Sequence, residues 1–179
     1  LFIEGAMGAY FSGRQYGMLF SNPLSQARPK FYAAIGKWFT PTSGMRIWGD
    51  VNKPKGDKTG EHLVSVGVDY LWNLSNTFRG YDPQRRLEFQ SSLGVNFLRQ
   101  RKLSSFAPGV NVGLRAQWNA NRMVALFLEP QLRVYEENEV RNNYTLAGYG
   151  FVPVGLFGMQ LRFNGYTPEV EKEHFATRK

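Results

Sequence analysis

Acidic and basic residues alternate with apolar ones in several segments of this chain. Asp69, Glu88 and Glu129 could act as acid and base groups, because a positioned carboxylate can donate or accept a proton. Arginines recur on the same face of these segments, and the planar guanidinium group is the best ionic partner for a carboxylate. We therefore interpret the charged face as a structural salt-bridge network rather than a catalytic site. The predicted network consists of Glu4, Arg46, Asp50, Asp69, Glu88, Arg115, Glu129, Arg133 and Arg162.

Other catalytic chemistry has little support in the sequence. The chain has no cysteine, which excludes disulfides, cysteine-zinc sites and thiol nucleophiles. Its two histidines are His62, beside Glu61, and His174, near the last residue, and neither belongs to a recognisable triad. The glycines of GAMGAY and GVNVG fall inside expected strands instead of a phosphate-binding loop. We expect no enzymatic activity, no cofactor and no metal site.

The elements that must position the charged residues are short alternating segments. The length of 179 residues fits one domain. Polar and apolar residues alternate in eight segments, as in strands with two unlike faces. The chain has no run of about 18 apolar residues, which excludes a transmembrane helix. The expected strands are 1–11, 30–39, 44–51, 62–74, 87–98, 109–118, 124–135 and 151–164.

The links between these segments alternate in length. Short turn-forming sequences, Thr40 to Gly44 and Asn119 to Arg122, join the second segment to the third and the sixth to the seventh. Longer links follow the first, third, fifth and seventh segments. One link on the short-turn side, SNTFRGYDPQRR, is longer than the other two. Short turns at one rim and long loops at the other are typical of outer-membrane barrels.

The stretch HLVSVGVDYLWNL, residues 62–74, shows that the two faces can be assigned in opposite ways. In a membrane barrel the valines face lipid and Asp69 points into the lumen. An eight-stranded barrel is just wide enough for side chains to fill, and arginines paired with acids suit such a confined space. The predicted fold is therefore an all-β, eight-stranded antiparallel up-and-down transmembrane β-barrel with a side-chain-filled polar lumen. The alternative is a soluble, lipocalin-like ligand-binding barrel with the apolar faces inside.

Aromatic and basic residues outside the lumen suggest contacts with the membrane. The net charge is +8, and we assign most of the excess, including Lys30, to the longer links. There it would meet lipopolysaccharide phosphates and acidic sugars. Nucleic-acid binding is not expected, because no basic face carries interleaved stacking aromatics. The candidate interface aromatics are Trp38, Tyr70, Trp72, Trp118 and Phe163, and the candidate lipopolysaccharide contacts are Lys53, Lys55, Lys58, Arg101 and Lys102.

Three stretches resemble one family: IGKWFTPTSGMRIWGDV (35–51), VDYLWNLSNTFRGYDPQRR (68–86) and VGLFGMQLRF (154–163). They are similar to the OmpA-like small outer-membrane barrels, in the variety common in Bacteroidota. The resemblance covers residues 1–164 and implies a Gram-negative outer-membrane location and a non-enzymatic envelope-structural or accessory role. Residues 165–179 would be a periplasmic tail or tether, so peptidoglycan binding by a further domain is not carried over. The alternative is an accessory barrel subunit of a larger outer-membrane complex for export, insertion or uptake.

Overall fold

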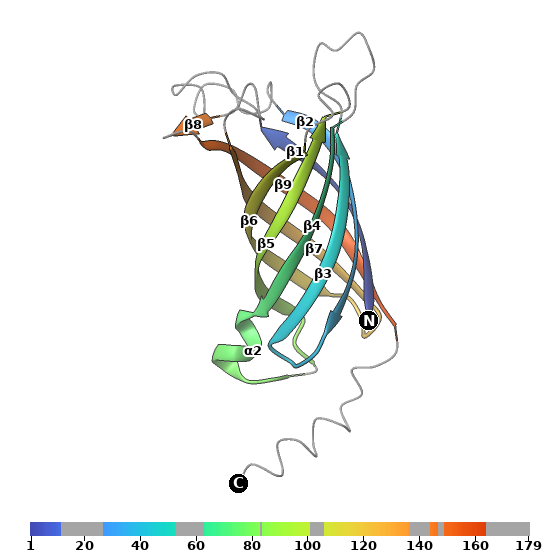
Figure 1. Ribbon diagram of the computed structural model, residues 1–179. Helices are drawn as coiled ribbons and strands as arrows, with labels where there is room; N and C mark the ends of the chain where they lie inside the picture. The colour runs from blue at the N-terminus through green and yellow to red at the C-terminus, as the bar shows by residue number, and fades with distance from the viewer. Residues whose placement is uncertain are drawn as a thin grey trace.

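A single antiparallel sheet closes on itself in the computed structural model, which describes residues 1–11, 27–52, 63–82, 84–100, 106–136, 144–146 and 149–163. Neighbouring long strands pair in chain order, and the first also pairs with the last, which forms a barrel (Figure 1). The predicted closed eight-stranded fold is confirmed. The strands are β1 (Phe2–Phe11), β2 (Ala27–Trp38), β3 (Ser43–Asn52), β4 (Leu63–Asn73), β5 (Leu87–Gln100), β6 (Phe106–Asn119), β7 (Val124–Glu136), β8 (Tyr144–Leu146) and β9 (Tyr149–Arg162).

The barrel closes where its first long strand, β1, pairs with its last, β9. β1 and β9 run antiparallel from the pair Phe2 and Arg162 to the pair Tyr10 and Val154. The three-residue strand β8 was not predicted; it pairs only with the first residues of β9 and adds a short flap outside the closed ring. The remaining eight strands leave no open sheet edge in the ring, as a barrel in lipid requires.

The side chains follow the inverted arrangement of a membrane barrel. In β4, Val64, Val66 and Val68 are 40%, 50% and 36% exposed, whereas Ser65 and Asp69 are buried. The same alternation continues around the barrel, with large apolar residues facing outward. The interior holds many polar side chains together with a cluster of buried apolar ones, among them Trp48, Phe127 and Leu156. This pattern does not agree with the soluble lipocalin-like alternative, in which the apolar faces would be inside. It also confirms the predicted polar, side-chain-filled lumen.

Three connections lie at one end of the barrel. The tight turns 39–42 and 120–123 join β2 to β3 and β6 to β7, and the β4–β5 connection contains helix α2 (Leu74–Arg79) (Figure 1). Asn73 caps α2 by accepting a hydrogen bond from the Asn76 backbone N–H at 3.0 Å, and Gly80 ends it with φ of 73°. In outer-membrane barrels the short-turn end faces the periplasm.

Most residues of the four longer links predicted for the opposite rim lie outside the described residues. The described ones belong to strands, since β5 extends to Gln100 and β6 begins at Phe106. Within the described ranges, α2 is the one helix, and no helix there is long and apolar enough to cross a membrane.

Candidate functional site

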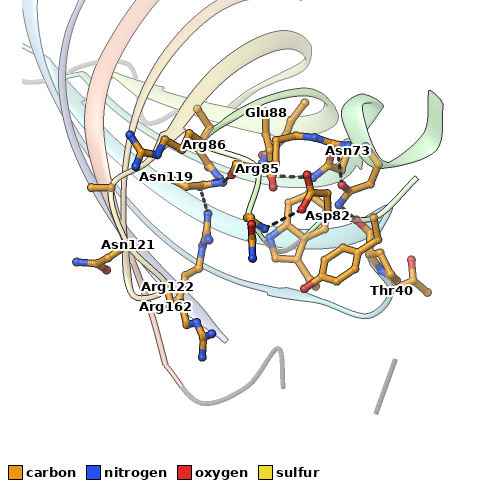
Figure 2. Close-up of a pocket in the computed structure, with 18 residues that line it drawn as sticks. Thr40, Asn73, Asp82, Arg85, Arg86, Glu88, Asn119, Asn121, Arg122 and Arg162 are labelled. Carbon is orange, nitrogen blue, oxygen red and sulfur yellow. Dashed lines mark hydrogen bonds between the residues drawn. The ribbon is translucent and has the colours of Figure 1, made fainter. Parts of the chain in front are cut away.

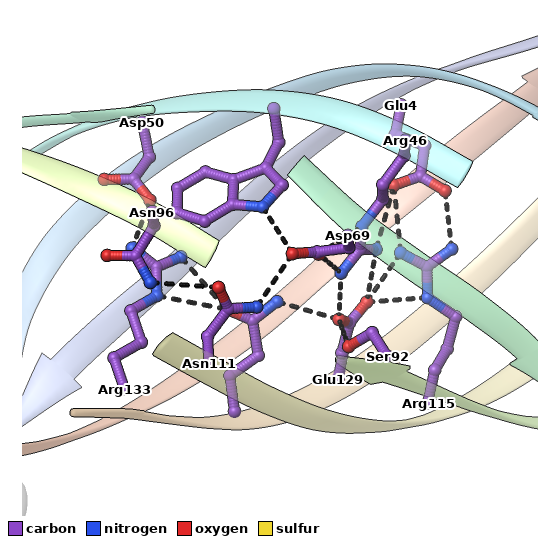
Figure 3. A network of polar contacts seen from close by, with 12 residues as sticks. Glu4, Arg46, Asp50, Asp69, Ser92, Asn96, Asn111, Arg115, Glu129 and Arg133 are labelled. Atoms are coloured by element: carbon purple, nitrogen blue, oxygen red, sulfur yellow. Dashed lines mark hydrogen bonds and ion pairs between the residues drawn. The ribbon is translucent and has the colours of Figure 1, made fainter. Parts of the chain in front are cut away.

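Five charged side chains from five strands meet inside the barrel (Figure 3). Arg46 on β3 lies directly opposite Asp69 on β4, and its Nε donates to Asp69 Oδ2 at 2.8 Å. Arg46 Nη1 also donates to Glu129 Oε2 at 2.9 Å. Arg115 on β6 donates from Nε to the same oxygen at 2.7 Å, and from Nη2 to Glu4 Oε2 at 2.9 Å. We call Glu4, Arg46, Asp69, Arg115 and Glu129 the central network.

The central network is sealed from solvent and well supplied with hydrogen bonds. Four of its five members have fully buried side chains: Glu4, Arg46, Asp69 and Glu129. The side chain of Arg115 is 3% exposed. Buried charges are tolerated only when paired and hydrogen-bonded. Because the carboxylates are paired with the arginines and are not accessible to a substrate, they are poorly placed for acid–base catalysis. Neutral donors complete their coordination: Trp48, Asn111, Ser92, Gln131 and Gln160.

A second ionic cluster contains Lys30, Asp50 and Arg133. Lys30 Nζ and Arg133 Nη1 lie 2.8 Å and 2.7 Å from Asp50 Oδ2. The assignment of Lys30 to a long loop was wrong: β2 already begins at Ala27, which places Lys30 on its inner face, 2% exposed. Arg133 also stacks on Trp48, its guanidinium carbon 4.1 Å from the ring centroid. Together the two clusters contain four acids and four bases, so their formal charges cancel.

Two residues of the predicted network, Glu88 and Arg162, lie apart from both clusters. They line a cavity of about 270 Å³ at the short-turn end (Figure 2). Glu88 Oε2 accepts from Asn73 Nδ2 at 3.0 Å, and Arg162 Nη2 donates to Asn119 Oδ1 at 2.6 Å. Their inward faces agree with the alternation, but their positions near strand ends place them with the turns.

Sequence reasoning did not anticipate this periplasmic cavity. Arg85 and Arg86, in the β4–β5 connection, and Arg122, in the β6–β7 turn, also line it. Arg85 is held by hydrogen bonds from Nη1 to Asn76 Oδ1 at 2.9 Å and from Nη2 to the Gly80 carbonyl at 3.0 Å. The available signal was the gathering of these three arginines in the short-turn links, which the expected arrangement brings to one rim.

The candidate interface aromatics divide into two groups. Tyr70, Trp72, Trp118 and Phe163 are 49%, 41%, 48% and 43% exposed on the outer side, near the short-turn end. Trp38 instead shares the inner face of β2 with Tyr32, lines the periplasmic cavity and lies 6.4 Å from Phe2 between ring centroids. The placement of Trp38 at the lipid interface is therefore corrected.

Several candidate residues cannot be placed. The proposed lipopolysaccharide contacts Lys53, Lys55, Lys58, Arg101 and Lys102, the two histidines and the tail 165–179 lie outside the described residues. Their predicted roles stay predictions.

Comparison with solved structures supports the fold. NspA, a neisserial surface protein, matches with a TM-score of 0.59 and 12% identity, over 90% of this chain and 96% of that one. OprG of Pseudomonas aeruginosa matches with a TM-score of 0.56 and 11% identity, over 92% and 95% of the chains. The N-terminal barrel of OprF from the same organism matches with a TM-score of 0.54 and 12% identity, over 89% and 96%. No family model matches the chain, and no curated protein is significantly similar to it in sequence.

The apolar outer surface of the barrel indicates where the chain is located. Outward residues such as Ile47, Leu93 and Leu114 are 61%, 64% and 59% exposed, in a ring of similar side chains around the barrel. A closed barrel with an apolar outer band and a polar interior is the arrangement that crosses an outer membrane. The chain is a small eight-stranded barrel of the bacterial outer membrane.

Proposed function

We propose that the chain is a non-enzymatic, envelope-structural barrel that does not conduct ions or solutes. One observation carries this proposal: the central network joins different walls of the barrel through buried side chains. Arg115 on β6 contacts Glu4 on β1, and Arg46 on β3 contacts Glu129 on β7, so these bonds cross the lumen. A solute would have to break several charge-assisted hydrogen bonds in order to pass.

The resemblance to OmpA-like barrels of the Bacteroidota type supports an envelope role. The resemblance rests on the residues of the three matching stretches, and the barrel formed by the described residues fits it. In this proposal the outward apolar side chains contact lipid, and the basic residues of the longer links contact lipopolysaccharide. No observation specifically favours the alternative of an accessory subunit in a larger complex.

Conductance measurements in planar lipid bilayers test the proposal. The refolded chain should insert without discrete channel openings. A matched variant, Glu4→Ser with Arg115→Ser, removes one acid and one base from opposite walls and leaves the formal charge unchanged. This variant should leak ions more than the parent, which shows that the assay detects an opened lumen. Regular channel openings by the unaltered chain would contradict a sealed barrel.

A further inference from the structure

The periplasmic cavity is lined by residues of three connections and of the ends of five strands. The segment that follows α2 is tied to the end of β6: the Asn119 backbone N–H donates to the Arg86 carbonyl at 2.7 Å, and Asn119 Nδ2 donates to the Arg85 carbonyl at 2.9 Å. These bonds hold the arginine-bearing links against each other before any ligand arrives. The cavity is therefore a preorganised feature of the barrel end, separate from the sealed central network (Figure 2).

Positive charge exceeds negative charge in the cavity lining. Four guanidinium groups face two carboxylates, which leaves an excess of two positive charges. Arg85 and Arg162 are held by the contacts described above, whereas Arg86 and Arg122 are exposed and their side chains have no polar partner among the described residues. Two exposed arginines at the rim of one cavity suit an anionic ligand, since each can bind a carboxylate through two parallel hydrogen bonds. The charged lining residues are Arg85, Arg86, Arg122, Arg162, Asp82 and Glu88.

Two buried glutamine side chains line the cavity, and the carbonyl oxygen of each has no hydrogen-bond donor. Gln90 and Gln117 are 3% and 1% exposed, and the Oε1 atom of each has no hydrogen-bond partner. Their Nε2 groups are already used, donating to Glu88 Oε2 at 3.5 Å and to Asn119 Oδ1 at 3.2 Å. These two contacts are long for N–H···O hydrogen bonds, and both carbonyl oxygens call for an N–H or O–H donor. A buried unsatisfied acceptor costs free energy until such a donor arrives.

We propose that this cavity binds a short acidic peptide from the periplasmic side. Peptide carboxylates would pair with Arg86 and Arg122. Peptide N–H groups would donate to Gln90 Oε1 and Gln117 Oε1 after these two buried amides rotate toward the cavity. A bare phosphate or acetate ion satisfies the arginines and leaves the amide oxygens without the N–H donors of a peptide. The volume of about 270 Å³ lies just below the range of about 300 to 1,000 Å³ typical of drug-sized ligand pockets, which restricts the peptide to a few residues.

Calorimetric titration of the detergent-solubilised full chain tests this site. The probes are N-acetyl-Glu-Glu and its uncharged counterpart N-acetyl-Gln-Gln-amide, with inorganic phosphate as a third. Arg86→Gln and Arg122→Gln each remove one exposed cation from the rim. Lys37→Gln is the matched control, because Lys37 is an exposed cation at the same end of the barrel but points outward from β2. Heat-modifiable gel migration confirms that every variant is folded.

The acidic dipeptide should bind the parent chain measurably, and each arginine variant should weaken it by about tenfold, since a hydrogen bond to a charged group is worth roughly one such factor. Lys37→Gln should leave the affinity for the acidic dipeptide unchanged, and the uncharged dipeptide should bind far more weakly. The proposal is overturned if the acidic dipeptide does not bind, if the uncharged dipeptide binds equally well, or if Lys37→Gln weakens binding as much as Arg122→Gln. Phosphate binding as tight as that of the dipeptide would also overturn it, since it would identify a simple anion site.

Discussion

Replacing Arg115 by Met should destabilise the barrel by several kcal/mol. Arg115 is 3% exposed and donates to both Glu4 and Glu129, so its loss leaves two fully buried carboxylates with Arg46 as their remaining ionic partner. The formal charge of the central network falls from −1 to −2, because three carboxylates then face one guanidinium instead of two. Removing one partner from a buried ion pair typically costs about 3–5 kcal/mol.

Neutral hydrogen-bond donors offset part of the free-energy cost of Arg115→Met. Gln160 Nε2 still donates to Glu4 at 2.8 Å, and Gln131 Nε2 to Glu129 at 2.7 Å. Methionine also retains much of the packing of the arginine stem against Phe127, whose ring centroid lies 4.0 Å from the guanidinium carbon. We therefore expect a loss of about 3 kcal/mol, at the lower end of the range for broken buried pairs.

Urea unfolding in lipid vesicles, followed by heat-modifiable gel migration, measures this loss. Arg122→Met is the matched control, because Arg122 is exposed in a turn and its replacement should change stability by less than about 0.5 kcal/mol. Adding Glu129→Gln to Arg115→Met should recover part of the lost stability by removing one unpaired charge. If Arg115→Met cost no more than Arg122→Met, Arg115 would not be a buried ionic partner and the description of the central network would be refuted.

Two further predictions concern the outer face and the packing of the lumen. Val66→Arg, on the outer face of β4, should cost about 2–4 kcal/mol in vesicles, whereas Leu87→Arg, at the first residue of β5, should cost about 0–1 kcal/mol; equal costs would show that Val66 does not face the bilayer interior. Gly67→Ala should cost about 1–3 kcal/mol, because its Cβ would lie 2.6 Å from Trp48 Cε2. Gly49→Ala, whose Cβ would meet nothing closer than 3.8 Å, should have little effect, and the same urea titration would expose an error if the two alanines behaved alike.

Alternation predicted the faces of the strands but not the depth of each residue along the barrel axis. Asp69 and Glu88 both occupy inward positions, yet Asp69 meets Arg46 in the central network whereas Glu88 lies at the periplasmic cavity. A period of two residues assigns each side chain to a face. The depth of a side chain along the barrel axis depends on the cross-strand register, such as the pairing of Arg46 with Asp69. Strand tilt and closure of the barrel set that register.

Two predictions were wrong, the placement of Lys30 in a loop and that of Trp38 at the lipid interface. Both relied on local sequence signals near strand ends. Lys30 follows Arg28 and Pro29, which resemble a loop, although Pro29 is tolerated as an outward residue in β2 opposite Ala9. Trp38 was placed by its nearness to a turn, because neither face of this strand is clearly polar in the sequence. The structure buries Tyr32, which shares its face with Trp38. The helix α2 has a readable cap at Asn73 and a stop at Gly80, but its six residues are too few for a periodic pattern to appear.

The sequence separations within the central network have a consequence for the order of assembly. Arg46 and Asp69 sit on adjacent strands and can pair as soon as that hairpin forms. Arg115 and Glu4 are 111 residues apart, and they meet only after β1 has joined β9. Such late contacts are absent from a partly closed barrel, so they slow the opening of the finished barrel far more than they speed its closure. We therefore expect the ion pairs across the lumen to form late in assembly and to slow the unfolding of the finished barrel.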